Sequence, residues 1–525
     1  MSELRLVPAA LAVWAAAACC ILFGTWAAAA ATGVFVVGCL IWRELGQAVL
    51  TAGLGVAAAV TATVRMRLCS TAAEVAGTVS GAPKQTSSGA YLVRVRVPGQ
   101  PSVTPVFVEE LPDGAVNGAQ VVGSGVVAES GRPGVNPFVL NGRVEVIGPP
   151  EGLAAFAHHV RSTFAAAVEA QVGPASQGLI PGMVLGDVNL QSAAEHQMYI
   201  DTGLSHLSAV SGANIAIVST FAAVAAAAAG AGLRGKIAAS AVALLVYAAL
   251  VGPEPSVLRA SVSGLVGLVA VLSSRQAEPI HALCLSVIGL VLVDSDLAVH
   301  YGFALSVAAT AGIVALFPLL YRALAATGWP DILVRALVVA VAADVATMPI
   351  VALMAGKVSL VAVGANVLVA PVVGPVTVLG LIAAVASLLP GGLEVPVLWC
   401  VEPMAWWVHT VAKIGAGLPS ATVSATPLTA VVAYGWIIAG FLAGRPRATV
   451  CAAAACVVVA AVMNQPAAPV DYTGLRAHVV DTAEEAEPVP QWAQLVVVLE
   501  SGPPKKRPVA TRQGIPVIFP NRKGT

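Results

Sequence analysis

Charged residues are scarce in this chain, and their scarcity excludes most classes of soluble protein. Only 10% of the 525 residues are Asp, Glu, Lys or Arg, whereas soluble domains carry about 25%. Hydrophobic residues make up 58% of the chain, and the mean hydropathy is +0.86. Basic and acidic residues each number 27, so the net charge is zero and does not point to an anionic partner. The composition predicts a protein that crosses a membrane several times.

Motifs for disulfide bonds, metals and nucleotide hydrolysis are also missing. The eight cysteines include no Cys-x-x-Cys pair, and most lie in apolar runs, where cysteine acts as a small hydrophobic residue. None of the eight histidines forms a His-x-His pair, and the chain contains no P-loop. We therefore predict no metal site, no cofactor and no energy source within the chain.

Residues 1–64 are apolar over too great a length for a signal peptide. Apolar sequence continues to Ile41 with one break at Phe23–Trp26, whereas the apolar core of a signal peptide has about 7–15 residues. We expect three membrane helices here, at residues 6–22, 26–41 and 46–64.

Residues 65–150 contain short runs of alternating hydrophobicity separated by Gly, Pro and Asn. This pattern predicts a small all-β domain, a barrel or sandwich outside the membrane. Seven basic and six acidic residues leave the region a net charge of +1, which is not typical of a strong nucleic-acid binder.

One of these runs carries a candidate contact for nucleic acid. Arg94 and Arg96 alternate with valines and therefore share one face of a strand. Together with Tyr91 they predict a modest platform for single-stranded DNA. The alternative is an ordinary solvated face of the sheet.

The rest of the chain divides into three parts. Residues 151–196 predict a linker at the membrane surface, because 151–172 have the periodicity of an amphipathic helix. Residues 197–463 contain a long series of membrane segments, in which 358–388 exceeds one plain span and predicts a broken or re-entrant helix pair. Residues 464–525 are rich in proline and predict a flexible extracytoplasmic tail.

The distribution of lysine and arginine indicates an orientation. With the N-terminus in the cytoplasm, three crossings place residues 65–196 outside, and later loops bring seven basic residues inside. The exceptions are Arg65, Arg67 and Lys357. The seven that agree are Arg234, Lys236, Arg275, Arg322, Arg335, Arg445 and Arg447.

A polar island interrupts the apolar sequence at residues 201–214, and apolar sequence resumes at Ile215. Each unpaired polar group is costly in hydrocarbon. The island therefore indicates either a path that contacts DNA or a hydrogen-bonded network that holds helices together. Its candidate residues are Asp201, Ser205, His206, Ser208, Ser211, Gly212 and Asn214.

Other polar residues fall within membrane segments. Arg259 can contact phosphate, extend to the surface or pair with Glu254, and Asn366 can line the path or cap a half-helix. Asp344 would repel DNA and fits a structural pair or a proton-coupling role. A last group fits an internal polar network: Glu402, His409 and Lys413.

Several stretches stand in a specific order: Gly178–Asp187, Gly203–Gly212, Pro255–Ala260, Tyr301–Gly312 and Met348–Pro371. In this order they resemble the ComEC competence family of bacterial inner-membrane proteins, which translocate transforming DNA. The resemblance covers roughly residues 170–400. It also implies an OB-like extracytoplasmic domain before the channel, in agreement with the expectation for residues 65–150.

The chain departs from the family pattern at two places. Where it has Gly212-Ala-Asn214, many members read Gly-Leu-His. Many members also end in a metallo-β-lactamase-like domain that needs His-x-His-x-Asp-His to bind paired metals. This chain has no such motif, and no glycine-rich continuation follows His478–Asp481. We therefore predict that it is not a nuclease.

The resemblance implies a non-enzymatic channel for single-stranded DNA in natural transformation. Its partners would be DNA, membrane lipid, an extracytoplasmic DNA receptor and a cytoplasmic helicase-like motor; the sequence does not indicate an oligomeric state. Two other classes stay open, a transporter of another anion and an intramembrane hydrolase. The hydrolase is disfavoured because adjacent Ser205 and His206 would point about 100° apart on a helix.

Overall fold

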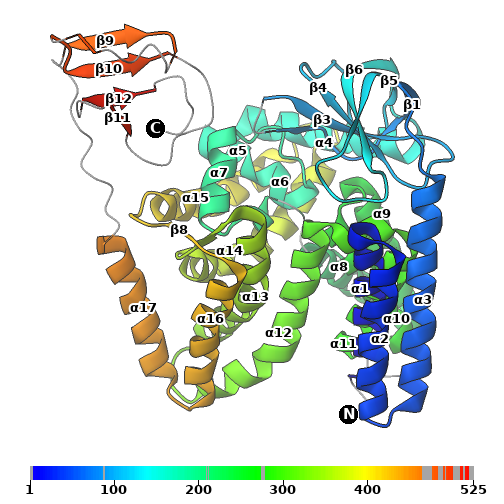
Figure 1. The fold of residues 1–525 in the computed structure, drawn as a ribbon. Coiled ribbons are helices and arrows are strands. Elements are labelled where there is room, and N and C mark those ends of the chain that lie inside the picture. The colour runs from blue at the N-terminus through cyan, green and yellow to red at the C-terminus, as the bar shows by residue number, and fades with distance from the viewer. Residues whose placement is uncertain are drawn as a thin grey trace. The chain divides into compact units, whose positions relative to one another are not determined.

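The computed structural model describes residues 4–86, 89–208, 210, 212–272, 278–463, 476–482, 489–490, 492–499, 509–511 and 515–519. The chain divides into two units, Met1–Val462 and Met463–Thr525, which are described separately. In the first unit three helices lead into a β domain, and a large helical body follows (Figure 1). Six described helices are long and apolar enough to cross a membrane, so the chain is a polytopic helical membrane protein, as its composition predicts.

The chain opens with three packed apolar helices: α1 (Val7–Phe23), α2 (Thr25–Ile41) and α3 (Leu45–Leu68). Gly24 separates the first two at a φ of 90°, which residues with a side chain rarely adopt. Small residues allow α2 and α3 to approach closely, because a Cβ on Gly55 would lie 2.5 Å from Cγ2 of Thr32. The bounds of these helices follow the three segments expected in residues 1–64.

A closed β domain follows α3. A β1–β3 pairing closes the sheet order β1-β5-β6-β4-β3, and β4 pairs with β6 in parallel. Five strands closed in this order form a Greek-key barrel of the OB type, which confirms the predicted small all-β domain. The strands are β1 (Glu74–Val79), β2 (Lys84–Gln85), β3 (Tyr91–Arg96), β4 (Thr104–Val108), β5 (Gln120–Glu129) and β6 (Phe138–Gly148).

Four helices then connect the β domain to the membrane segments: α4 (Gly152–Gln171), α5 (Pro174–Gln177), α6 (Leu179–Leu185) and α7 (Ala193–Asp201). Helix α4 buries Val160, Phe164 and Val168 on one face, as expected of an amphipathic helix. Helix α6 is buried at every residue. It tolerates Pro181 because the first turn of a helix needs no N–H donor at that position.

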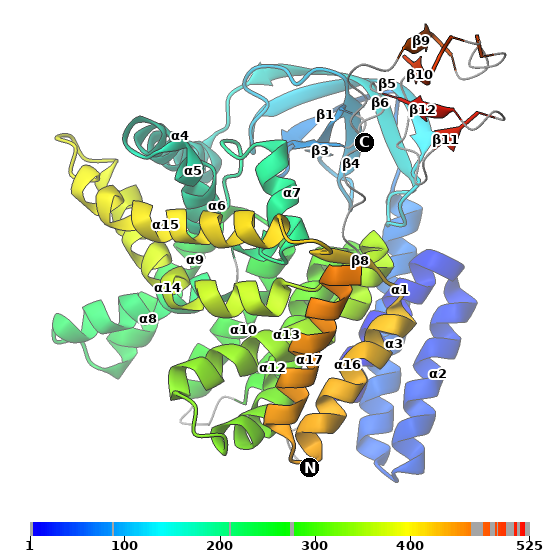
Figure 2. The ribbon, with the colours of Figure 1, turned by 90° about the vertical axis from the view of Figure 1, so that its left-hand side faces the viewer.

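Ten further helices are described. In Figure 2, α15 lies across the helical body, whereas α16 runs along it. The six candidate spans are α3, α9, α10, α12, α13 and α14. The ten helices are α8 (Gly212–Ala228), α9 (Leu233–Val251), α10 (Pro255–Leu272), α11 (Pro279–Val293), α12 (Tyr301–Ala325), α13 (Asp331–Ala355), α14 (Ala362–Ala386), α15 (Val395–Ala416), α16 (Pro427–Leu442) and α17 (Pro446–Met463).

The expected broken helix pair at 358–388 is wrong. Helix α14 is continuous over 25 residues and contains both Pro371 and Pro375. The start of the segment is instead a short strand, β7 (Lys357–Ser359), which pairs with β8 (Thr422–Ser424). Each proline removes one backbone N–H donor. A membrane bundle tolerates this loss because neighbouring helices can satisfy the backbone group that is left without its partner.

Two connections between helices meet the β domain. Nζ of Lys84 in β2 lies 3.9 Å from Oε1 of Glu254, between α9 and α10. Oδ2 of Asp296, between α11 and α12, accepts a hydrogen bond of 2.6 Å from the hydroxyl of Ser102 in the β domain. Both connections therefore lie on the face of the helical body that carries the β domain, as an alternating topology requires.

The second unit contains a small sheet where the sequence predicts a tail. Its strands are β9 (Ala477–Val480), β10 (Leu495–Val498), β11 (Val509–Ala510) and β12 (Pro516–Ile518). Strand β10 pairs in parallel with both β9 and β12. Val496 and Val498 are fully buried in its core. The described part of the second unit therefore forms a small sheet with its own buried core.

Candidate functional site

The polar island forms an unwound connection between two helices. Helix α7 ends at Asp201, a single turn of 3-10 helix covers Ser205–Leu207, and α8 begins at Gly212. Gly203 has a φ of +69°, and a Cβ at this position would lie 2.5 Å from Cβ of Ala362. Glycine is therefore required where the chain leaves α7.

The first residues of the island face the connection between α13 and α14. Oδ1 of Asp201 lies 2.7 Å from Nζ of Lys357 and accepts a hydrogen bond from Nε2 of Gln197 over 2.8 Å. His206 is exposed, and its Nδ1 lies 3.1 Å from a backbone carbonyl. Ser211 lies outside the described residues.

At the other end of the island, Ser208 and Asn214 are buried and hydrogen-bonded. The Ser208 hydroxyl donates to the carbonyl of Ser205 over 2.9 Å. Nδ2 of Asn214 donates to the carbonyl of Met183 over 2.7 Å, and its Oδ1 accepts from the Thr377 hydroxyl over 3.4 Å. Asn214 thus connects α8 with α6 and α14.

Arg259 reaches the island from α10. It is only 7% exposed, and its Nε donates to the hydroxyl of Ser306 on α12 over 2.8 Å. A Cβ on Gly212 would lie 2.8 Å from its Nη2, so the guanidinium lies against the amino end of α8. The alternative pairing of Arg259 with Glu254 is not formed between these described residues, because the Glu254 carboxylate lies beside Lys84.

Asn366 does not join this group. Its Nδ2 donates over 2.9 Å to the carbonyl of Ala362, one turn earlier in the same helix. Asp344 is buried in α13 and accepts a hydrogen bond of 2.5 Å from the hydroxyl of Tyr434 on α16. This contact has the form of the structural pair that the sequence predicts.

The predicted polar network around α15 is present only in part. Oε1 of Glu402 accepts from the backbone N–H of Gly173 over 2.8 Å. Nδ1 of His409 lies 3.4 Å from the hydroxyl of Tyr199 on α7. Lys413 is exposed, and no hydrogen bond or ion pair joins it to this group among the described residues. These contacts attach α15 to the short helices above it.

The predicted platform of Tyr91, Arg94 and Arg96 is wrong in one respect. Tyr91 packs against the core of the barrel, on the same side of β3 as Val93 and Val95. Arg94 and Arg96 point to the opposite side because side chains alternate along a strand. The two arginines share a face, but Tyr91 does not share it with them.

Basic side chains and histidines gather where the β domain meets the helical body. His300 caps α12 and accepts a hydrogen bond from the N–H of Gly302 over 3.1 Å. Burial, and then the positive charge of Arg94, lower the pKa of His300. Burial, and then the charge of Lys84, lower the pKa of His196 on α7. Lys84 and Arg94 thus bring positive charge to this junction from the β domain, whereas Glu254 and Asp296 bring negative charge to it from the helical body.

The described part of the island lacks the geometry of a hydrolytic triad. A triad requires its side chains to be hydrogen-bonded to one another. Here His206 contacts a backbone carbonyl, Ser208 donates to a backbone carbonyl, and Asp201 pairs with Lys357. Within the described ranges, no group of three or more His, Cys, Asp or Glu residues is placed to hold a metal ion.

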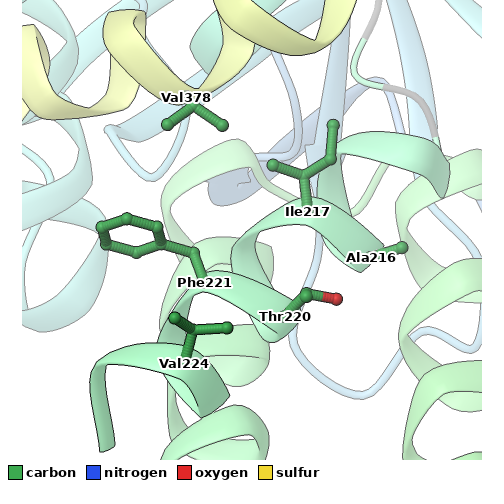
Figure 3. A pocket seen from close by; sticks show the side chains of 6 residues that line it. All are labelled: Ala216, Ile217, Thr220, Phe221, Val224 and Val378. Atoms are coloured by element: carbon green, nitrogen blue, oxygen red, sulfur yellow. The ribbon is translucent and has the colours of Figure 1, made fainter. Parts of the chain in front are cut away.

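An open pocket of about 400 Å³ lies between α8 and α14 (Figure 3). Phe221, Ile217 and Val224 line it from α8, and Val378 lines it from α14. Five of its six lining side chains are hydrocarbon, and Thr220 adds a hydroxyl, so the lining carries no charge for an ionic ligand. The polar contacts of the island lie elsewhere.

Several residues that hold the island were missed by sequence reasoning. Ser306 lies in a stretch that carries the family resemblance, and this signal would have found it. Tyr247 donates from α9 to the carbonyl of Val184 over 2.7 Å, and Ser256 donates to the carbonyl of Val210 over 3.0 Å. The sequence does not indicate which group a single tyrosine or serine in an apolar helix will bond to.

Comparison with known families gives one match. A family model described as "Competence protein" matches residues 183–449, just over half of the chain. The matched region begins in α6, includes the island and extends into α17. Neither the curated proteins nor the solved structures searched contain a match.

Proposed function

Because the chain belongs to the competence protein family, we propose that it forms the channel through which single-stranded DNA crosses the bacterial cytoplasmic membrane during natural transformation. Family membership supports a role in competence and DNA uptake generally. The observation that carries the finer proposal is the position of the island. It lies between the linker helices and α8, where the series of apolar helices after the β domain begins, and the matched region contains it.

In this proposal the β domain lies outside the cytoplasmic membrane and receives the strand. Arg94 and Arg96 on β3, with Lys84 on β2, provide positive charge for the phosphate backbone without reading the bases. The strand then passes the island into the helical body. The N-terminus lies in the cytoplasm, as the distribution of basic residues indicates.

The channel works with other proteins. An extracytoplasmic receptor delivers DNA, and a cytoplasmic helicase-like motor supplies energy, since the sequence has no P-loop of its own. The chain itself acts without catalysis. The island's hydrogen bonds to backbone carbonyls support this, because they occupy the groups that a hydrolase would need.

Gene disruption in competent cells of the host tests the proposal. Cells would be given radiolabelled DNA, and label at the surface would be separated from label protected against external nuclease. We expect the disrupted strain to bind DNA normally but to lose protected label, and the intact gene to restore it. Unchanged protected label in the disrupted strain would refute the channel.

A further inference from the structure

Arg259 is a buried cation whose charge is not balanced by an acidic partner among the described residues. It is 7% exposed, and its Nε hydrogen-bonds to Ser306. In the described residues it takes part in no ion pair. A guanidinium carries five N–H donors. A buried charge with one neutral partner is costly, so its place in the fold needs a reason.

Its surroundings add to the positive potential. Helix α8 has 17 residues and begins at Gly212, and a Cβ on Gly212 would lie 2.8 Å from Nη2 of Arg259. The amino end of a helix carries positive partial charge and free backbone N–H groups. The guanidinium and the helix end therefore repel each other, and an anion that contacts both would offset this repulsion.

Two acids, Glu254 just before α10 and Asp201 in the island, are already paired with lysines. Glu254, one turn before Arg259, lies 3.9 Å from Lys84, and Asp201 lies 2.7 Å from Lys357. The hydroxyl of Ser256 donates to the carbonyl of Val210 over 3.0 Å, which fixes the turn before α8. Neither acid pairs with Arg259, so an anionic ligand would supply the negative charge that this arrangement lacks among the described residues.

We propose that Arg259, Ser306 and the amino end of α8 form a binding site for a phosphate group. Gly212 belongs to the site because it has no side chain, which lets the guanidinium lie directly against the amino end of α8. Assigning the phosphate to the backbone of a DNA strand rests on the proposed function, whereas the anion site itself does not. Free phosphate and a phospholipid headgroup offer the same chemistry.

Phosphate binding by the purified full-length protein tests the site. We expect inorganic phosphate to raise the melting temperature of the wild type in detergent, and to raise that of Arg259→Gln much less. Arg322→Gln is the matched control, since Arg322 is exposed and lies at the other end of α12. Gly212→Ala pushes the guanidinium away from the helix end without changing the charge, so it tests the site if Arg259→Gln fails to fold. Equal shifts in wild type, Arg259→Gln and Gly212→Ala would overturn the proposal.

The source of the phosphate is tested with three probes. A single-stranded oligo-dT should bind the wild type about tenfold more tightly than Arg259→Gln, as expected for the loss of a charged hydrogen bond. An oligonucleotide with an uncharged methylphosphonate backbone should show no such difference. If nanodiscs containing phosphatidylglycerol show the difference instead, the ligand is lipid, and the assignment to DNA is wrong.

Failure of this site and failure of the proposed function give different results. If gene disruption leaves uptake intact while phosphate still binds at Arg259, the site stands and the channel fails. If disruption abolishes uptake while Arg259→Gln binds phosphate and oligo-dT like the wild type, the channel stands and the site fails.

Discussion

Asn214 is a buried side chain whose amide nitrogen and amide oxygen both form hydrogen bonds. Its amide donates to the carbonyl of Met183 and accepts from Thr377, so that it connects three helices. Asn366 carries the same functional group, but its amide bonds to Ala362 in its own helix. The two asparagines therefore differ in what they hold together: Asn214 links three helices, whereas Asn366 bonds within its own helix.

Replacing Asn214 with alanine should lower the free energy of unfolding by about 1–3 kcal/mol, because a buried carbonyl loses its donor. Asn366→Ala is the matched control and should change stability by less than about 1 kcal/mol, since it breaks a contact within one helix. Denaturant titration of the detergent-solubilised protein measures both. Equal losses in the two variants would contradict the bridging role of Asn214.

His300 predicts a dependence of stability on pH. Burial and Arg94 lower its pKa in the folded state, so the unfolded chain binds a proton more readily. Its contribution to stability is complete above the unfolded pKa of about 6.5 and is lost as the pH falls through the folded pKa. Melting temperatures between about pH 7.5 and pH 5 should therefore fall less in His300→Asn, which keeps an N-capping side chain.

The exposed His159 provides the control for this measurement. His159→Asn should follow the wild-type curve across the whole pH range. A His300→Asn variant that loses as much stability on acidification as the wild type would show that the acid sensitivity arises at other groups.

At the scale of elements, the contact between α6 and α14 depends on a glycine. A Cβ on Gly380 would lie 2.3 Å from Cγ2 of Val184, whereas a Cβ on Gly374 of the same helix would meet no atom within 4 Å. Helix α6 also supplies the carbonyl groups that Asn214 and Tyr247 bind. Its close packing on α14 therefore holds the inner end of the island in place.

Gly380→Ala should destabilise the protein by about 1–3 kcal/mol, because overpacking forces α6 and α14 apart. Gly374→Ala should be neutral or stabilising by up to about 1 kcal/mol, because alanine favours a helix over glycine. Denaturant titration distinguishes the two variants. A stable Gly380→Ala would mean that α6 does not pack closely on α14.

The sequence predicts elements well where one physical property decides them. Apolar length locates the helices of residues 1–64, and alternation locates the β domain. The expectation for 358–388 failed because Pro371 and Pro375 suggest a break, whereas neighbouring helices let α14 continue. Tyr91 does not join Arg94 and Arg96 because alternation along β3 places its side chain on the core face of the strand.

At the scale of the whole molecule, the β domain is held to the helical body by Arg65. Its Nη2 lies 2.7 Å from Oδ1 of Asp294 and 3.7 Å from Oδ2 of Asp296. Asp296 in turn accepts hydrogen bonds from the Ser102 hydroxyl and from the N–H of Val135, both in the β domain. One arginine thus supports several contacts across the junction.

Arg65→Gln should loosen this junction, and we expect faster hydrogen exchange in the segments around Ser102 and Val135. Arg67→Gln is the control, since Arg67 is exposed and the described residues contain no ion pair to it. Unchanged exchange in Arg65→Gln would show that other contacts suffice to hold the β domain.

The candidate site could be predicted only in outline, because its partners come from distant parts of the chain. The island and Arg259 stand out as polar residues in apolar sequence. Their contacts with Met183, Thr377 and Ser306 depend on how helices far apart in sequence pack together. Periodicity reports the face of one helix, not the helix that lies against it.

The passage of single-stranded DNA through this chain is the central claim, and flux into proteoliposomes measures it most directly. Purified protein would be reconstituted, a membrane potential imposed, and a labelled oligonucleotide followed until it is protected from external nuclease. We predict that single-stranded oligo-dT becomes protected, whereas a duplex of equal length does not. Protection no greater than in empty liposomes, with folded and inserted protein, would contradict the account.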